Sequence, residues 1–292
     1  MKNIDIAVVI LHFNDFDMTR KYIDNLKGLN WGDYRHHFII VDNHSPDDSG
    51  QELCKWFETD LETTVILLPE NIGFSRGNNQ GIRFAKEKLN ADLVVVSNND
   101  IYIKTKEFPS ILEKEYKLSR FSVYGPDIYS MSKETHQNPM RQVPLNIEDI
   151  HKKVRKIDRI LPVLWILNQT GLYDTLKNIR GLFKKKNYSW KPQRIENCVL
   201  HGSFFVIDRK YLDKYPEGLF EGTFLYMEED ILAYRCFKED LKMVYDPSVK
   251  IIHFDGISSM KTAGNRCIKF MNEMKETKKS CLSFLNYMKD DQ

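Results

Sequence analysis

The sequence predicts an α/β fold with a mostly parallel, doubly wound sheet flanked by helices. Three observations support this prediction. Short apolar runs alternate with amphipathic stretches over the first hundred residues. Each run is apolar at nearly every position, as parallel strands buried on both faces are. Polar residues follow the end of each run, where an open parallel sheet places its ligand-binding edge.

The first four strands and three helices are expected in alternation. The strands are expected at residues 6–11, 37–42, 64–69 and 92–97, and the helices at residues 17–29, 49–58 and 77–89. After residue 108 the pattern becomes irregular. Strand signals return at residues 203–208, 242–246 and 250–255. These late strands are too few to close a second sheet, so we expect residues 1–292 to form a single domain.

Residues 130–196 are expected to form a basic helical insertion. Between His151 and Arg194 there are twelve Lys and Arg residues and only two acidic ones. Apolar residues recur at helical spacing, at Ile150, Val154, Ile157 and Leu161. Two interpretations stay open. The segment through residues 150–191 is an amphipathic element at a membrane surface, or it is a solvated basic face whose apolar side packs on the domain.

Residues 257–292 are expected to form a helical tail. The tail is rich in Lys from Arg266 onwards, and its apolar residues recur among charged ones. Those available for burial are Ile268, Met271, Met274, Leu282 and Leu285.

Composition and charge narrow the class of protein. Hydrophobic residues make up 42% of the chain and charged residues 29%, as in ordinary globular proteins. A formal charge of +2 does not indicate a general polyanion binder. The five cysteines are scattered without a CxxC pair, which favours free thiols in a reducing compartment. Apolar runs are much shorter than the roughly 20 residues of a membrane span. We therefore expect a cytoplasmic protein, peripheral at most to the inner face of the plasma membrane.

The polar residues at the strand ends are expected to meet at one edge of the sheet. His12 and Asn14 follow the first strand, Asp42 ends the second, a glycine-rich segment at residues 69–81 follows the third, and "SNND" ends at Asp100. Turn geometry or helix capping would also explain the Asp and Asn residues. The phosphate-binding patterns GxGxxG and GxxxxGK[ST] are absent from the expected positions. A dinucleotide dehydrogenase and a P-loop NTPase are therefore disfavoured.

Six segments together resemble the family 2 inverting glycosyltransferases, which have the GT-A fold. In chain order they are "VVILHFN", "VDNHSPD", "NIGFSRGNNQGI", "VVVSNND", "HGSFFVIDR" and "FLYMEEDILAYRCFKEDLKMVYDPSVKIIHFDG". The similarity covers residues 4–108 and 198–256. It implies a nucleotide-sugar-binding half at residues 1–108 and an acceptor half at residues 109–256. The chain is most similar to bacterial rhamnosyl- and galactofuranosyltransferase-like enzymes of surface polysaccharide assembly.

The resemblance implies a site for a divalent cation, Mg²⁺ or Mn²⁺. Asn98, Asn99 and Asp100 occupy the position of the family's DxD-type motif, with Asp100 as the carboxylate ligand. The two amides would contact ribose or metal-bound water, and fewer anionic ligands imply weaker metal binding. His253 matches a histidine that commonly joins the metal site, although a lone His is more often a packed residue. His201 and Gly202 begin a late strand, where glycine lets a sugar approach the backbone.

The resemblance also implies nucleotide-binding residues. Asp42 would accept a hydrogen bond from the nucleobase imide or from ribose, which suits the uracil or thymine of a UDP- or dTDP-sugar. Arg76 and Asn79 fall in the segment that follows the nucleotide, and Arg76 would face a phosphate. A solvated arginine is the alternative for Arg76.

The candidate general base lies among three consecutive acidic residues, Glu228, Glu229 and Asp230. Favourable charge at a helix N-terminus is the simpler interpretation. Counting back from Arg235, which matches the arginine that closes the family's motif, Glu229 takes the place of the catalytic acid. Ile231 replaces a second acid found in relatives. We predict Glu229 as the base, followed by Asp230 and then Glu228.

The implied function is transfer of a sugar, such as rhamnose or galactofuranose, to a hydroxyl of a glycan or a polyprenyl-linked acceptor. A catalytically degenerate GT-A domain that scaffolds nucleotide or glycan is the alternative, because one acid is missing and two of the motif's residues are neutral. A nucleic-acid-binding protein is disfavoured, since no recognised reading motif accompanies the basic insertion.

Overall fold

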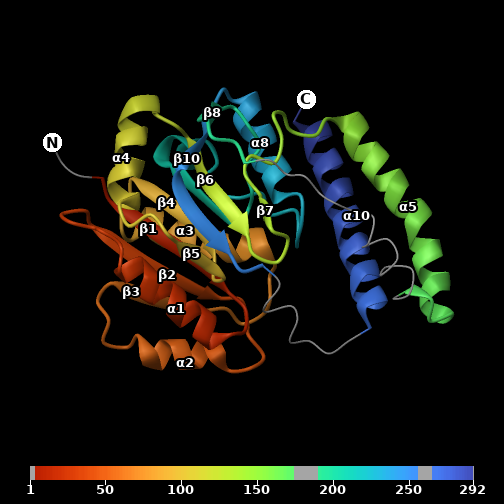
Figure 1. Cartoon of the computed structure of the whole chain (residues 1–292), viewed down its shortest axis with the longest axis horizontal. Helices are drawn as coiled ribbons and strands as arrows, with labels where there is room; N and C mark the ends of the chain where they lie inside the picture. The colour runs from red at the N-terminus through yellow and green to blue at the C-terminus, as the bar shows by residue number, and fades with distance from the viewer. Residues whose placement is uncertain (1–3, 174–189, 256–264, 292) are drawn as a thin grey trace.

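The computed structural model describes residues 4–173, 190–255 and 265–291, and a single mixed sheet organises them (Figure 1). Ten strands form this sheet. Its order is β3 (Thr63–Leu67), β2 (His36–Asp42), β1 (Ile6–His12), β4 (Leu93–Asn98), β9 (Phe204–Asp208), β6 (Val123–Ser130), β10 (Met243–His253) and β5 (Ile101–Ile103). The short strands β7 (Thr135–His136) and β8 (Ile195–Glu196) pair with β6 and β10.

The strands of the first hundred residues are parallel, as expected. β2 and β4 flank β1, and β3 continues beyond β2. The antiparallel strand β9 then joins β4 to β6, and β10 runs parallel to β6. The late strands therefore extend the first sheet, and the predicted α/β class with a mostly parallel sheet is confirmed.

Helices cover both faces of the sheet. On one face, α1 (Phe16–Lys27), α2 (Ser49–Trp56) and α4 (Phe108–Ser119) bury residues such as Tyr22, Leu53 and Leu112 against alternate strand positions. On the other face lie α3 (Phe74–Glu87), α7 (Arg209–Lys214) and α8 (Glu228–Lys238), which pack against the intervening positions. This division explains why the strands are apolar at consecutive residues.

The two long helices α5 (Ile147–Gln169) and α10 (Arg266–Asp290) pack antiparallel beside the sheet (Figure 1). They are far apart in the sequence, and we call this pair the helical hairpin. Of the predicted apolar stripe of α5, Ile150, Val154 and Ile157 are buried and Leu161 is partly buried. Ile150 and Val154 share a cluster with Phe284 and Leu285 of α10. The apolar side of the basic insertion therefore packs on the domain. Residues 174–189, which carry part of the predicted basic segment, lie outside the described residues.

The buried face of α10 differs from the one predicted for the tail. Leu285 is buried, but Ile268 and Leu282 are exposed and Met271 and Met274 are only partly buried. The buried residues instead include Cys281, Phe284 and Met288. Apolar residues occur on both faces of this Lys-rich helix, so the spacing of apolar residues did not identify the buried face.

Two strand predictions also need correction. Residues 242–246 and 250–255 form one strand, β10, with a register shift between Asp246 and Lys250. Its neighbour β6 was not predicted, because Gly125 and Pro126 disfavour strands. The shift lies opposite Pro126, where the ladder can accept a residue without an N–H donor.

The five cysteines all lie in the described part of the chain, and none of them forms a disulfide there. None of the described helices combines the length and the apolar character that crossing a bilayer requires.

Candidate active site

The carboxyl ends of the parallel strands bring the predicted site residues to one edge of the sheet. His12 pairs in register with Asp42, and Leu11 with Asn98. Further along, β5 places Ile101 opposite His253, and the N–H of Asn98 donates to the carbonyl of Ser203 (2.9 Å) just before β9. Segments far apart in the sequence, including the start of β9, therefore meet where the resemblance implies a nucleotide-sugar site.

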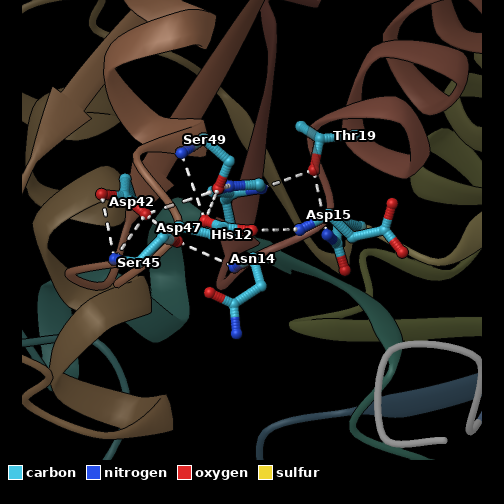
Figure 2. Close-up of polar contacts among 9 residues, drawn as sticks. His12, Asn14, Asp15, Thr19, Asp42, Ser45, Asp47 and Ser49 are labelled. Atoms are coloured by element: carbon cyan, nitrogen blue, oxygen red, sulfur yellow. Dashed lines mark hydrogen bonds and ion pairs between the residues drawn. The ribbon is translucent and has the colours of Figure 1, made fainter. Parts of the chain in front are cut away.

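His12 lies beneath this edge and is fully buried. Its Nδ1 is 2.6 Å from Thr19 Oγ1, and its Nε2 is 2.8 Å from Ser49 Oγ (Figure 2). Burial lowers the pKa of His12, although the charges of Asp42 and Asp47 oppose this shift. A neutral imidazole with both nitrogens engaged ties β1 to α1 and α2, so His12 shapes the site from behind.

Asn14 differs from its neighbours in Figure 2, because its side-chain amide points away from the other labelled groups. Its backbone lies in the left-handed region (φ 61°), and its N–H donates to Ser45 Oγ (2.8 Å). Its Oδ1 is buried and has no hydrogen-bond partner within the described part of the chain. An unsatisfied amide oxygen at this edge is suited to a ligand donor.

Asp42 is buried and accepts hydrogen bonds from Ser45, through the backbone N–H (3.2 Å) and through Oγ (2.5 Å). These bonds match the turn interpretation that the sequence left open. A Cβ on Gly50 would lie 2.3 Å from Asp42 Oδ2, so a glycine there makes room for the carboxylate. Contact between Asp42 and a nucleobase stays a prediction.

The amides of the "NND" segment have unequal roles. The Nδ2 of Asn99 donates to Thr19 Oγ1 (2.9 Å), the hydroxyl that also contacts His12. Asn98 is half-buried at the end of β4. Asn99 therefore belongs to the network that supports the edge, and its predicted contact with a ligand stays untested.

Asp100, in the turn between β4 and β5, meets His253, at the end of β10. Asp100 Oδ1 lies 3.2 Å from His253 Nε2. Both residues are buried, and this oxygen accepts no hydrogen bond from the described residues. His253 Nδ1 lies 2.8 Å from Gln137 Oε1, so Nδ1 carries the proton in the neutral ring and Nε2 presents its lone pair to Asp100.

This pair fits a divalent cation. Two acceptor atoms that face each other need a shared cation between them, either a proton or a metal ion. Ligands at roughly 2.1 Å from one ion are about 3 Å apart at right angles, close to the observed spacing. Among the residues described, no cluster of three or more His, Cys, Asp and Glu side chains is arranged around a metal. Oxygens of a diphosphate and water would have to complete the coordination.

The predicted base Glu229 lies at the N-terminus of α8, across the start of β9. The N–H of Gly202 donates to Glu229 Oε1 (3.3 Å). A Cβ on Gly202 would lie 2.9 Å from that oxygen. Glycine at this position therefore lets the carboxylate approach the backbone, a more specific role than the sugar contact that the sequence suggested.

A short series of contacts links the Asp100–His253 pair to the predicted base Glu229. The rings of His253 and His201 are in edge contact, with centroids 5.8 Å apart. His201 immediately precedes Gly202, which holds Glu229. Burial lowers the pKa of His201 to about 4. Its ring is therefore neutral at pH 7 and does not repel a cation.

Glu228 and Asp230 have different surroundings. Burial raises the pKa of Glu228 to about 8, and the neighbouring charge of Glu229 adds to the rise. Its Oε1 is buried and without a hydrogen-bond partner among the described residues. Asp230 is buried in an ion pair with Arg141 and also accepts from the N–H of Leu145 (3.3 Å). Of the three acids, Asp230 is thus the one held by a cationic partner.

Asn79 and Arg76 hold the loop that precedes the acidic residues. Asn79 is fully buried; its Nδ2 donates to the carbonyl of Leu219 (2.8 Å), and its Oδ1 accepts from that residue's N–H (2.7 Å). Arg76 Nε donates to the carbonyl of Glu221 (2.8 Å). These bonds join α3 to the loop before α8. The predicted phosphate and nucleotide contacts of Arg76 and Asn79 stay untested.

The sequence did not reveal Gln137 or Arg141 as partners in the site. Gln137 contacts His253, and Arg141 pairs with Asp230. Both follow β7 in the irregular part of the chain, and each pairs with a residue about 90 or more positions away. Only the tertiary fold brings them together.

Comparisons with known proteins identify the family of the chain. The family model described as "Glycosyl transferase family 2" matches residues 7–215. The chain is 24% identical over 249 residues to the low-salt glycan biosynthesis hexosyltransferase Agl10 of Haloferax volcanii, covering 85% of this chain and 67% of that protein.

Solved structures show the same fold. S. aureus TarS (residues 1–349) aligns with a TM-score of 0.56 and 10% identity, covering 92% of this chain and 65% of that one. The mannosyltransferase PcManGT of Pyrobaculum calidifontis aligns with a TM-score of 0.51 and 12% identity, covering 95% and 70%. This chain therefore spans about two thirds of the length of these solved chains. The solved structures share the GT-A fold and the family model matches more than half of the sequence, so the chain belongs to glycosyl transferase family 2.

Proposed function

We propose that this glycosyltransferase moves a sugar from a UDP- or dTDP-sugar to a hydroxyl of a glycan or polyprenyl-linked acceptor, with inversion at the anomeric carbon. Rhamnose and galactofuranose are the sugars that the motifs favour. The observation that carries the proposal is the continuous series of contacts from Asp100 through His253 and His201 to Glu229. A cation held by Asp100 and His253, and a carboxylate base linked to them through His201 and Gly202, suit a displacement on a sugar bound beside both.

In this mechanism Glu229 accepts the proton of the acceptor hydroxyl while that oxygen attacks the anomeric carbon. The bond from that carbon to the diphosphate oxygen breaks, and the nucleoside diphosphate leaves with the electron pair. The hydrogen bond from Gly202 fixes one carboxylate oxygen, so the other can face the acceptor. Attack opposite the leaving group inverts the anomeric centre.

Asp100 and His253 would hold a divalent cation, which when bound supplies charge stabilisation for the departing diphosphate. Asp100 Oδ1 faces His253 Nε2 and is buried without a hydrogen-bond partner among the described residues, which supports this assignment. Solved structures with the same fold include TarS in complex with UDP-GlcNAc, and PcManGT in complex with GDP-Man and Mn²⁺. A nucleotide-sugar donor and a divalent cation are therefore the first ligands to try.

A donor-panel assay tests the proposal. Release of UDP or dTDP from UDP- and dTDP-sugars is measured with Mn²⁺, with Mg²⁺ and with chelator. We expect turnover with at least one donor, stimulated by metal. Glu229→Gln should lower the rate by about 10²- to 10⁴-fold, since the amide cannot accept the proton. Donor affinity should stay unchanged.

Two results would count against this proposal. Full activity of Glu229→Gln would move the base to another residue. Donor binding without turnover by the wild-type protein would favour the scaffold interpretation. Glu52→Gln, an exposed substitution on α2, is the matched control and should leave turnover unchanged.

A further inference from the structure

The helical hairpin has one end at which apolar side chains gather. Asn265 Nδ2 donates to Asn168 Oδ1 (2.7 Å), and Cys267 Sγ lies 3.3 Å from the carbonyl oxygen of Leu164. These contacts place the C-terminal end of α5 beside the N-terminal end of α10, low on the right in Figure 1. We call this end the hairpin tip. Its exposed apolar residues are Val163, Trp165, Ile166, Leu172 and Ile268.

These side chains are about half exposed. Val163, Trp165 and Ile166 are 54%, 56% and 53% exposed, although Leu164 between them is buried. Leu172 and Ile268 are exposed by 50% and 47%. Clustered exposed apolar residues, including a Trp, are typical of surfaces that bind a protein or a membrane.

A basic band adjoins the tip on α5. Lys152, Arg155, Lys156 and Arg159 are exposed on the helix side opposite the buried residues. Two of the three acids of α5 are in ion pairs: Glu148 with Lys152 (2.9 Å) and Asp158 with Lys278 (2.5 Å). At 1.5 Å per residue, Arg159 and Ile166 are about 10 Å apart along the axis. If the helix stands upright on a bilayer, this separation matches the thickness of the headgroup layer above the acyl chains.

We propose that the hairpin tip docks on an anionic phospholipid surface. Trp165 and Ile166 enter the boundary between headgroups and acyl chains, while Arg155 and Arg159 contact lipid phosphates. A second copy of the chain is a poorer occupant, because it would bring an identical basic band against this one. This docking would hold the enzyme at the surface where the polyprenyl-linked acceptor of the proposed function lies. The docking itself does not depend on transfer.

Co-sedimentation of the full chain with vesicles tests the proposal. We expect binding to phosphatidylcholine vesicles that contain phosphatidylglycerol, weak binding without it, and weaker binding at high salt. Arg159→Glu should lower the partition coefficient by about fivefold for each unit of charge removed. Ile166→Asp should also lower it, since a carboxylate would enter the boundary.

The matched controls lie on α4, away from the hairpin (Figure 1). Leu118→Asp replaces an exposed apolar helix residue and Lys114→Glu an exposed basic one, and both should bind vesicles like the wild type. Equal binding by Ile166→Asp and wild type, or no preference for phosphatidylglycerol, would overturn the proposal. So would self-association of the wild type that Ile166→Asp abolishes. Donor turnover is measured in parallel, so that failure of docking and failure of the proposed function are distinguished.

Discussion

At the scale of single residues, Gly202 controls the position of the proposed base. Its missing side chain leaves room for Glu229, and a Cβ would lie 2.9 Å from Oε1 and 3.2 Å from Cδ. The carboxylate would therefore have to move, while the backbone conformation suits alanine as well as glycine.

We expect Gly202→Ala to lower the turnover number by roughly 10- to 100-fold, because a displacement of about 1 Å disturbs the reacting geometry. The free energy of unfolding should change by less than about 1 kcal/mol. Gly28→Ala, where the new Cβ meets only backbone oxygens at 3.4 Å, is the control and should keep full turnover. Unaltered turnover in Gly202→Ala would mean that Glu229 is not the group whose position matters.

Glu228 makes stability depend on pH. Its pKa is raised from 4.5 to about 8, first by burial and then by the charge of Glu229. The folded protein therefore keeps a proton that the unfolded chain releases, so this residue's contribution to stability falls as pH rises from about 4.5 to about 8. Glu228→Gln removes the proton linkage.

The advantage of Glu228→Gln over wild type, in the free energy of unfolding, should grow between about pH 5 and pH 8 and then level off. Denaturant unfolding at several pH values measures it. The exposed Glu52→Gln should differ from wild type by a constant amount. A constant difference for Glu228→Gln as well would show that its carboxyl titrates normally.

At the scale of elements, the α5–α10 hairpin supports the acidic end of α8. Val154 and Phe284 share an apolar cluster with Met227 and Ile231, which lie on either side of the acidic residues. Lys153 Nζ also lies 3.1 Å from Met227 Sδ. The insertion and the tail thus reach the proposed base through packed side chains.

Phe284→Ala should lower the free energy of unfolding by roughly 3–5 kcal/mol, because it opens a cavity at a fully buried position. Leu282→Ala, two residues away on the same helix and 43% exposed, should cost less than about 1 kcal/mol. Denaturant unfolding measures both. Similar costs for the two variants would contradict the packing of α10 described above.

At the scale of the whole molecule, we propose that residues 1–292 form one folding domain. The sheet runs without interruption from β3 to β5, and Asn79 binds the loop of the other half directly. The denaturation experiment on Phe284→Ala also tests this proposal. Far-UV dichroism and the fluorescence of buried Trp31 should report one coincident transition.

The donor half could be predicted from sequence because its signals are local. Strands such as residues 6–11 are apolar throughout, and polar motifs follow them directly. The later part of the sheet could not be predicted in this way. Its strand β6 contains Gly125 and Pro126, which disfavour strands, and it forms a strand only through pairing with its neighbours. The same holds within the site. Asp100 and Glu229 belong to motifs, whereas Gln137 and Arg141 contribute through contacts that no local pattern encodes.

The antiparallel direction of β9 has a consequence for how such an enzyme can diversify. The chain leaves β6 at Ser130 and enters β9 at Phe204, and both points lie at the edge that holds the proposed site. The connection between these two points carries β7, α5 and β8, so its length can differ while the strand order from β3 to β5 is kept. We propose that exchanging this connection between relatives, with Gln137, Arg141, His201 and Gly202 kept in place, would change the acceptor while the parallel strands stay as they are.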